Sequence, residues 1–218
     1  MKPLSARANI RGFTLLDTLV VLFVLFIVAA MLMPTLAGSH RAPGQKCMSN
    51  LRQIEVGFYM YWDDNGRKFP MQVSVTNGGT MEFINSGHTF SHFQKVLGNQ
   101  HDPRFLVCPL DKTRKAATNF QTLTDLNLSY FLNADVVTTG DPAHSILAGD
   151  RLLQVNGLPV KPGLFLLTTN LNLGWTPKLH GGFGNLAFAD GHVEMIRSTN
   201  LKKVLQNQPL ATNRLCVP

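Results

Sequence analysis

Three groups of residues combine reactive side chains with a spacing that suggests chemistry. The first is an ionisable acid inside a long apolar run, the second is a set of thiols that oxidation can join, and the third is a histidine followed at a fixed distance by an aspartate and a glycine. The residues are Asp17, then Cys47, Cys108 and Cys216, and finally His180, Asp190 and Gly191. Helices and turns must position each group, and the sequence predicts several of these elements.

Asp17 lies near the start of a segment that is otherwise apolar. Only Asp17 and Thr18 interrupt its apolar run before Pro34. A helix over residues 13–34 would be about 33 Å long, enough to cross the hydrocarbon core of a bilayer. We therefore predict a transmembrane helix over residues 13–34, which Pro34 ends or kinks. An ionisable group in such a helix needs either a partner or a position near the wet edge of the membrane.

The flanks of this segment predict its orientation. Basic residues precede it, and the positive-inside tendency places them in the cytoplasm, so the rest of the chain is expected outside. A secretory signal peptide is the alternative, with 37–39 (Ala-Gly-Ser) as its cleavage site, but the apolar part of such a signal usually has about 7–15 residues, fewer than this run. The basic residues are Lys2, Arg7 and Arg11.

The net charge gives a second indication about partners. The formal charge of the whole chain is +7, but outside residues 1–12 there are 17 basic residues against 13 acidic ones, a balance of +4. Lysine and arginine form no cluster in the rest of the sequence, so nucleic acid is not an expected partner.

The residues around Asp17 resemble a known signal. Gly12 is followed by Phe-Thr-Leu-Leu, the acid and the long apolar run, an order that resembles the type IV prepilin signal shared by type II secretion pseudopilins. The resemblance implies that a prepilin peptidase cuts after Gly12 and methylates the amine of Phe13. It also implies that Asp17 pairs with the terminal amine of a neighbouring subunit in a filament, so that both buried charges are compensated. The family usually has glutamate here, so methylation and assembly are the steps that this departure affects.

Residues 46–64 have apolar side chains at steps of four and three, which is typical of one face of a helix. The tripeptide Ala-Pro-Gly at 42–44 favours a break before it. We predict an outward helical stem over 35–66, with a break near 42–44, followed by an α+β domain over 67–218. The apolar face is expected to consist of Cys47, Leu51, Ile54, Phe58 and Tyr61, and the polar face to carry Asn50, Arg52, Glu55 and Asp63.

The cysteines are interpreted from this topology. Cys47 and Cys108 would both lie on the oxidising side of the membrane, where disulfides form, and we expect a bridge between them that ties the helix to the domain. Cys216 is the odd cysteine: it is free, pairs with another chain or replaces one member of the pair.

The residues around Asp190 and Gly191 indicate a β-hairpin. An Asp-Gly pair between two alternating runs favours a two-residue turn, in which both turn residues have positive φ. This register places alternate residues on opposite faces of the hairpin, one apolar and one small and polar. The apolar face would carry Leu186, Phe188, Val193 and Met195, and the other face Ala187, Ala189, His192 and Glu194.

Nine residues separate His180 from Asp190. This H-x9-DG spacing, together with the segment CMSNLRQI at 47–54, resembles pseudopilin-like families of planctomycetes and verrucomicrobia, and the resemblance implies a pilin-like α+β fold. We expect His180 to cap the hairpin through a hydrogen bond to the Asp190 carboxylate. A calcium ion on Asp190 is the alternative, because related pseudopilins bind calcium in their C-terminal regions; otherwise no metal and no cofactor is expected.

Enzymatic motifs do not occur in the sequence. It contains no Gly-x-Ser-x-Gly, no phosphate loop and no His-Glu-x-x-His, so we do not expect an enzyme. A glycosidase-type pair of carboxylates could be formed by the fold alone and stays open. The competing class is a membrane-anchored module that binds polysaccharide or DNA without polymerising. Its sugar-binding face would consist of Tyr59, Tyr61, Trp62 and Trp175.

The sequence thus predicts a pseudopilin-like subunit with a leader over 1–12, a transmembrane helix and a long amphipathic helix packed on a small antiparallel sheet with irregular loops. It would sit in a bacterial inner membrane as a single-pass protein, with its N-terminus in the cytoplasm and its domain in the periplasm. Its expected partners are the prepilin peptidase, other pseudopilin subunits, secretion platform proteins and membrane lipid. Its expected role is structural, in a short filament of a type II secretion or related system.

Overall fold

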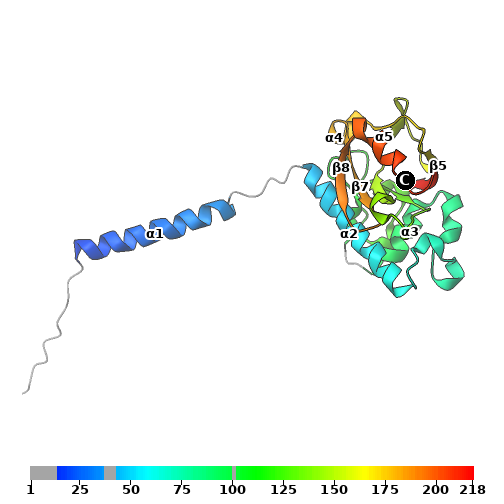
Figure 1. Cartoon of the computed structure of the whole chain (residues 1–218). Helices are drawn as coiled ribbons and strands as arrows, with labels where there is room; N and C mark the ends of the chain where they lie inside the picture. The colour runs from blue at the N-terminus through cyan, green and yellow to red at the C-terminus, as the bar shows by residue number, and fades with distance from the viewer. Residues whose placement is uncertain (1–13, 37–42, 100–101) are drawn as a thin grey trace, which may run out of the picture. The chain divides into compact units, whose positions relative to one another are not determined.

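The computed structural model describes residues 14–36, 43–99 and 102–218. The chain divides into two compact units, Met1–His40 and Arg41–Pro218. The first contains helix α1 and the second is an α+β domain (Figure 1). The predicted processing site at Gly12 and Phe13 and the start of the predicted break near 42–44 lie outside the described residues.

Helix α1 spans Leu15–Leu36. Its large apolar side chains between Leu15 and Val28 are exposed, by 39% at Ile27 to 85% at Leu15. Ten consecutive residues from Leu19 to Val28 belong to this set, so the apolar surface extends around the whole helix. Within the residues that the structure describes, no helix has the combined length and hydropathy expected of a membrane span.

Helix α2 spans Pro43–Asp64 and belongs to the domain unit. Four members of its predicted apolar face are completely buried, while the fifth, Tyr61, is half-buried. Burial of a leucine, isoleucine or phenylalanine side chain contributes about 1.5–3 kcal/mol each, so this face is what holds α2 on the domain. The completely buried residues are Cys47, Leu51, Ile54 and Phe58.

A glycine in the left-handed region ends α2. Gly66 has φ +64°, and the N–H of Arg67 donates to the carbonyl of Trp62 over 2.9 Å, which is the long hydrogen bond of a Schellman cap. The Arg67 guanidinium also lies over the Trp62 ring, 5.5 Å from its centroid. The chain then turns back toward the domain.

Short helices and loops connect α2 to the sheet. After α2 the chain forms the α-helices α3 (Thr89–Leu97), α4 (Pro177–His180) and α5 (Ser198–Gln206). The 3-10 helices are η1 (Pro70–Gln72), η2 (Val75–Asn77), η3 (Met81–Ser86), η4 (Pro103–Leu106), η5 (Phe120–Thr122), η6 (Asp125–Asn127) and η7 (Pro142–His144).

Two antiparallel sheets complete the domain, which confirms the predicted α+β class with a small antiparallel sheet. A six-stranded sheet has the order β5-β9-β1-β2-β7-β8, and a three-stranded sheet has the order β4-β3-β6. The strands are β1 (Tyr130–Asn133), β2 (Ile146–Asp150), β3 (Leu153–Val155), β4 (Leu158–Pro159), β5 (Gly163–Thr168), β6 (Leu173–Trp175), β7 (Phe183–Phe188), β8 (Val193–Arg197) and β9 (Thr212–Val217).

Both faces of the six-stranded sheet are covered. One face packs against α2 and α3, and its apolar residues form the α2-side cluster, which includes Leu51, Phe93, Leu132, Leu147 and Ala187. The other face packs against α5 and the small sheet, and its residues form the α5-side cluster, which includes Phe131, Trp175, Leu186, Ile196 and Leu201. Central strands such as β1 are therefore buried along their whole length.

The turn between β7 and β8 has three residues, so the predicted two-residue turn is wrong. The N–H of Phe188 donates to the carbonyl of His192 over 3.0 Å, and the N–H of Gly191 donates to the carbonyl of Phe188 over 3.2 Å. The loop is therefore 189–191. Its positive φ belongs to Gly191, at +101°, as in a type I turn followed by a G1 bulge. An Asp-Gly pair suits both turn types.

The extra loop residue shifts the register of the hairpin by one. Ala187 pairs with Val193, and Leu186 pairs with Glu194, so the prediction that Phe188 and Val193 share one face is wrong. Val193 lies with Ala187 in the α2-side cluster, whereas Leu186 and Phe188 lie in the α5-side cluster. A shift of one residue moves side chains to the opposite face, because strand residues alternate.

Candidate functional site

Asp17 caps the start of α1. Its carboxylate oxygen Oδ2 accepts a hydrogen bond from the backbone N–H of Thr14 over 2.9 Å and lies 2.8 Å from the Thr14 hydroxyl. The N–H of Asp17 in turn donates to that hydroxyl over 3.3 Å. This reciprocal pair is a capping box, which satisfies backbone donors that the first turn of a helix leaves free. The acid in the apolar run therefore has a local structural role.

Cys47 and Cys108 are joined by a disulfide, with Cα atoms 5.0 Å apart. Cys47 lies in the first turns of α2 and Cys108 follows η4, so the bond ties α2 to the loop region 61 residues later in the chain. Both residues are completely buried. Cys216 on β9 is a free, buried cysteine, and burial raises the pKa of its thiol to about 12.

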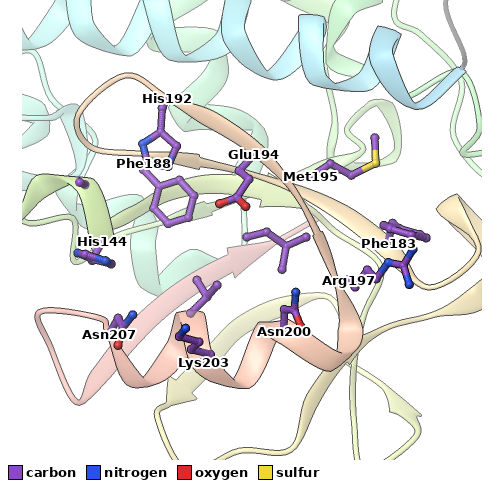
Figure 2. A pocket seen from close by; sticks show the side chains of 13 residues that line it. His144, Phe183, Phe188, His192, Glu194, Met195, Arg197, Asn200, Lys203 and Asn207 are labelled. Atoms are coloured by element: carbon purple, nitrogen blue, oxygen red, sulfur yellow. The ribbon is translucent and has the colours of Figure 1, made fainter.

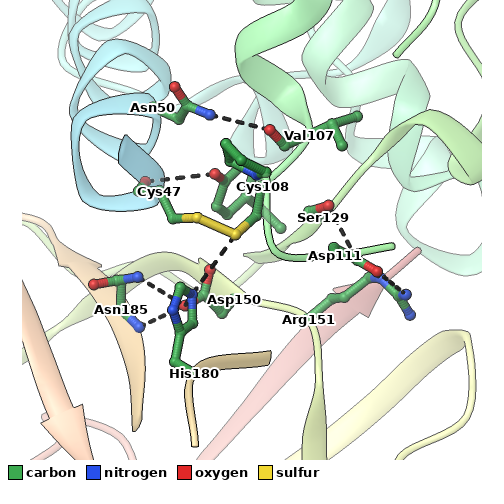
Figure 3. The surroundings of a disulfide bond; sticks show 12 residues. Cys47, Asn50, Val107, Cys108, Asp111, Ser129, Asp150, Arg151, His180 and Asn185 are labelled. Carbon is green, nitrogen blue, oxygen red and sulfur yellow. Dashed lines mark hydrogen bonds and ion pairs between the residues drawn. A yellow bond between two sulfur atoms is a disulfide. The ribbon is translucent and has the colours of Figure 1, made fainter. Parts of the chain in front are cut away.

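His180 contacts this disulfide, so its predicted hydrogen bond to Asp190 is wrong. Its Nε2 atom lies 3.6 Å from the Sγ atom of Cys108 and 3.4 Å from Oδ2 of Asp150 (Figure 3). The histidine ends α4 and faces the interior of the domain, with its side chain 4% exposed. His180 and Asp190 therefore lie at opposite ends of β7 and take part in separate contacts.

Asp150 is the buried carboxylate of this group, and sequence reasoning missed it. Its Oδ2 atom accepts hydrogen bonds from the backbone N–H and the side-chain amide of Asn185, over 2.7 and 2.9 Å. Its Oδ1 atom is buried without a hydrogen-bond partner. The sequence offers little indication of this role, because an aspartate at the end of an apolar strand segment is also typical of a turn. We refer to Cys47, Cys108, Asp150, His180 and Asn185 as the disulfide cluster.

Asp190 pairs with His192 inside the turn. Its Oδ1 atom accepts a hydrogen bond from the N–H of His192 over 3.1 Å and lies 2.6 Å from Nδ1 of the same residue. Partial burial raises the pKa of Asp190, but the hydrogen bonds from His192 outweigh it and leave that pKa below its usual value. The His192 ring also stacks on Phe188, with centroids 4.3 Å apart. The turn is thus fixed by its own residues.

Glu55 is the second acid that the fold brings to this turn. It was expected on the polar face of the helix, but it is 4% exposed, and that prediction is wrong. Burial, and next the negative charge of Asp190, raise the pKa of Glu55 to about 7. Its Oε1 atom is buried without a hydrogen-bond partner and lies beside Gly191, where an added Cβ would be 3.2 Å away.

A groove of about 530 Å³ runs between α2 and this turn. Three carboxylates line it together with aromatic and apolar side chains. The pKa of Glu55 is raised and that of Asp190 is lowered. Such a groove presents acid groups to a cation or a hydroxyl-rich ligand, but Asp190 is already engaged by His192 and Glu55 is almost closed off from solvent. The lining residues are Glu55, Val56, Tyr59, Met60, Trp62, Asp63, Asp190 and Gly191.

The aromatic residues proposed for a sugar-binding face are divided among different environments. Trp175 is 2% exposed in the α5-side cluster. Tyr59 donates its hydroxyl to the carbonyl of Ala189 and packs edge-on against Trp62. Tyr61 donates to the carbonyl of Gly78. These contacts leave no continuous aromatic platform among the four residues.

A larger cavity of about 680 Å³ lies between β8 and α5 (Figure 2). Its lining has mixed charge, with Glu194, Arg197 and Lys203 as well as apolar side chains. Of its histidines, His192 is engaged by Asp190, and Nδ1 of His144 lies 2.6 Å from the carboxylate of Asp141. This arrangement indicates no single class of ligand.

Comparisons of the chain with protein-family models, with curated proteins and with solved structures found no match in any of the three.

Proposed function

We propose that this chain is a structural, pseudopilin-like subunit that is anchored in the membrane through the segment 13–34 and assembles into a short filament. The observation that carries the proposal is the apolar surface of α1, which surrounds the helix over Leu19 to Val28, in a chain whose domain unit has its own two-sided core. An apolar helix of this kind needs an apolar environment, either lipid or other copies of the same helix. A filament subunit meets both environments in turn. Its helix lies in lipid before assembly and packs against the helices of other subunits afterwards.

The place of Asp17 suits this role. Its carboxylate binds the backbone N–H of Thr14, and Thr14 would be the second residue of a chain cut after Gly12. In the membrane, the capping box keeps the carboxylate hydrogen-bonded at the helix start. In a filament, the same carboxylate would pair with the methylated amine of Phe13 in a neighbouring subunit, because two buried charges are tolerated only together.

The disulfide supports the proposed location of the domain. Disulfides form and persist in oxidising compartments such as the periplasm. The Cys47–Cys108 bond fixes α2, the element closest in sequence to the anchor, to the body of the domain. A domain in the periplasm with the basic residues 1–12 in the cytoplasm is the orientation that the positive-inside tendency favours.

Processing and assembly define the proposed partners. A prepilin peptidase would cut after Gly12, and further pseudopilin subunits and the secretion platform would follow. The competing role, a membrane-anchored module for polysaccharide or DNA, has less support because the aromatic residues proposed for it are engaged in separate contacts. We propose no enzymatic activity.

Crosslinking in native membranes tests assembly. The chain is produced together with the peptidase, crosslinked and separated by size. We expect a ladder of multimers from the natural chain and from Asp17→Glu, which keeps the acid. Asp17→Ala should be cut normally but remain a monomer, because the terminal amine loses its counter-ion.

Thr18→Ala is the matched control for this experiment. It removes a polar group from the same helical turn, where the Thr18 hydroxyl donates to the carbonyl of Thr14, and it should leave the ladder unchanged. A ladder of normal yield from Asp17→Ala would contradict the role of the acid. A natural chain that stays monomeric under these conditions would contradict the filament itself.

A further inference from the structure

The disulfide cluster brings together four side chains of the kinds that bind zinc. The Sγ atoms of Cys47 and Cys108 and a ring nitrogen of His180 all lie within 4.8 Å of one another. They come from α2, from the segment after η4 and from the end of α4, and the carboxylate of Asp150 on β2 adjoins them (Figure 3). The fold alone assembles this group, since its members are far apart in sequence.

The distances within the group suit tetrahedral coordination. Zinc bonds of about 2.3 Å to sulfur and about 2.0–2.2 Å to nitrogen or oxygen place neighbouring ligand atoms about 3.3–3.8 Å apart. The Nε2 atom of His180 is 3.6 Å from Sγ of Cys108 and 3.4 Å from Oδ2 of Asp150. His180 is thus at coordination spacing from both Cys108 and Asp150. To bind one ion, the two sulfur atoms must separate, and Asp150, which lies outside the group of three within 4.8 Å, must move toward them.

Asp150 supplies an independent indication of a cation. The residue is completely buried, and its Oδ1 atom has no hydrogen-bond partner. A buried carboxylate with an unsatisfied oxygen is costly unless a positive charge accompanies it. The two hydrogen bonds from Asn185 orient the carboxylate through Oδ2, as groups around a metal ligand do, and leave Oδ1 as the oxygen free to bind a cation.

We propose that reduction of the Cys47–Cys108 bond converts the disulfide cluster into a closed zinc site, with Cys47, Cys108, His180 and Asp150 as ligands. A thiol or phosphine reductant supplies two electrons and is oxidised, and the S–S bond gives two thiols. Zn²⁺ then displaces one proton from each thiol and binds two thiolates, a neutral imidazole and a carboxylate, without changing its own oxidation state. Four protein ligands leave no open position, so the site is structural.

The proposal gives the domain two mutually exclusive crosslinks that add to the apolar packing of α2. The disulfide is the crosslink in the oxidised chain, and the zinc ion is the crosslink in the reduced chain. The zinc form would also keep both thiolates engaged while Cys216 is free and buried in the same α2-side cluster. Metal binding would then protect the correct cysteine pair until oxidation joins it.

Metal titration of the reduced full-length chain in detergent tests the site. The chain is reduced with a phosphine without oxygen and titrated with Co²⁺, whose absorption reports tetrahedral thiolate ligation, and then with Zn²⁺ against a chromophoric chelator. We expect one equivalent of metal per reduced chain and none in the oxidised chain. His180→Asn should weaken zinc binding by more than about tenfold.

Two controls make the result decisive. His144→Asn removes a histidine that is paired with Asp141 on the surface, and Cys216→Ala removes the remaining thiol; both should keep the cobalt spectrum. Circular dichroism checks the fold of each reduced variant. The proposal is overturned if the reduced natural chain binds no zinc, if His180→Asn binds zinc as tightly, or if the reduced chain is unfolded and zinc does not restore its structure.

Discussion

The carboxylate of Glu55 on α2 lies against the backbone of Gly191 in the β7–β8 turn, so close that a Cβ on Gly191 would be 3.2 Å from Oε1 of Glu55. This contact joins the long helix to the turn of the H-x9-DG segment. Two features favour glycine at position 191: its positive φ, and the Glu55 carboxylate, which leaves little room for a side chain.

The burial of Glu55 at this contact, and next the negative charge of Asp190, make the stability of the domain depend on pH. The pKa of Glu55 is raised from 4.5 to about 7 in the folded chain, so between these values the folded state holds a proton that the unfolded state has lost. The free energy of unfolding therefore falls as pH rises from about 4.5 to 7. Glu55→Gln should remove this dependence and stabilise the domain at pH 8 by on the order of 2 kcal/mol.

Urea unfolding at pH 5 and pH 8 measures this effect, with fluorescence from Trp62 and Trp175 reporting on the domain. Glu194→Gln is the control, because Glu194 is an exposed acid on β8, and it should keep the slope of the natural chain. A Glu55→Gln variant with an unchanged pH slope would refute the buried-acid interpretation.

Gly191→Ala should destabilise the domain by about 1–3 kcal/mol, because the new methyl group meets both an unfavourable φ and the Glu55 carboxylate. Gly140→Ala is the matched control: Gly140 has φ +84° but nothing within 4 Å of its Cβ position, so it measures the backbone contribution alone. Thermal unfolding of both variants gives the difference. Equal losses would mean that the Glu55 contact contributes nothing.

The position of Glu55 shows where sequence reasoning about α2 succeeded and where it failed. The apolar spacing located the buried face, because burial follows the angle around the helix. Glu55 is four residues after Leu51 and three before Phe58, which places it on the same side as both. Its charge led to the prediction that it lies on the exposed face of the helix, but its position around the helix places it on the buried face.

The hairpin and the histidine show two other limits. An Asp-Gly pair allows two-residue and three-residue turns, and alternation could not decide between them because β7 is buried on both faces. His180 meets Asp150 and Cys108, which lie 30 and 72 residues away in sequence. Contacts between residues so far apart depend on the order of the strands in the sheet. Local patterns in a single sequence do not predict that order, so they did not predict these contacts.

Asp111 and Arg151 form a nearly buried ion pair that should matter for stability. The two oxygens of Asp111 accept hydrogen bonds from Nε and Nη2 of Arg151 over 2.8 and 3.0 Å, and their side chains are 1% and 11% exposed. Asp111→Ala leaves the guanidinium without its counter-ion and should cost about 3–5 kcal/mol. Urea unfolding at pH 7 measures the cost.

The surface pair of Asp102 and Arg104 is the comparison for this variant. Both side chains are largely solvated, at 46% and 79% exposed, and solvated pairs contribute little. Arg104→Ala removes this pair and keeps the Asp102 carboxylate that caps η4, so it should leave the urea midpoint nearly unchanged. If both variants shift the midpoint equally, the buried pair has no special role.

Loss of the disulfide should lower the free energy of unfolding by about 2–5 kcal/mol, because the bond closes a loop of 61 residues in the unfolded chain. The double variant Cys47→Ala, Cys108→Ala is compared with the natural oxidised chain by urea unfolding. Cys216→Ala removes a buried free thiol and should cost less, about 1 kcal/mol. A larger loss from Cys216→Ala than from the double variant would show that the bond does not stabilise the domain.

The central claim is that the chain is processed as a prepilin, and its N-terminus tests that claim most directly. The measurement is intact mass with N-terminal sequencing of the protein purified from its native membrane together with the matching peptidase. The proposed function predicts a chain that begins at Phe13, with or without one added methyl group. A chain that still begins at Met1 would indicate a simple membrane tether, and one that begins near Ser39 would show that the apolar segment is a secretory signal; either result would contradict the claim.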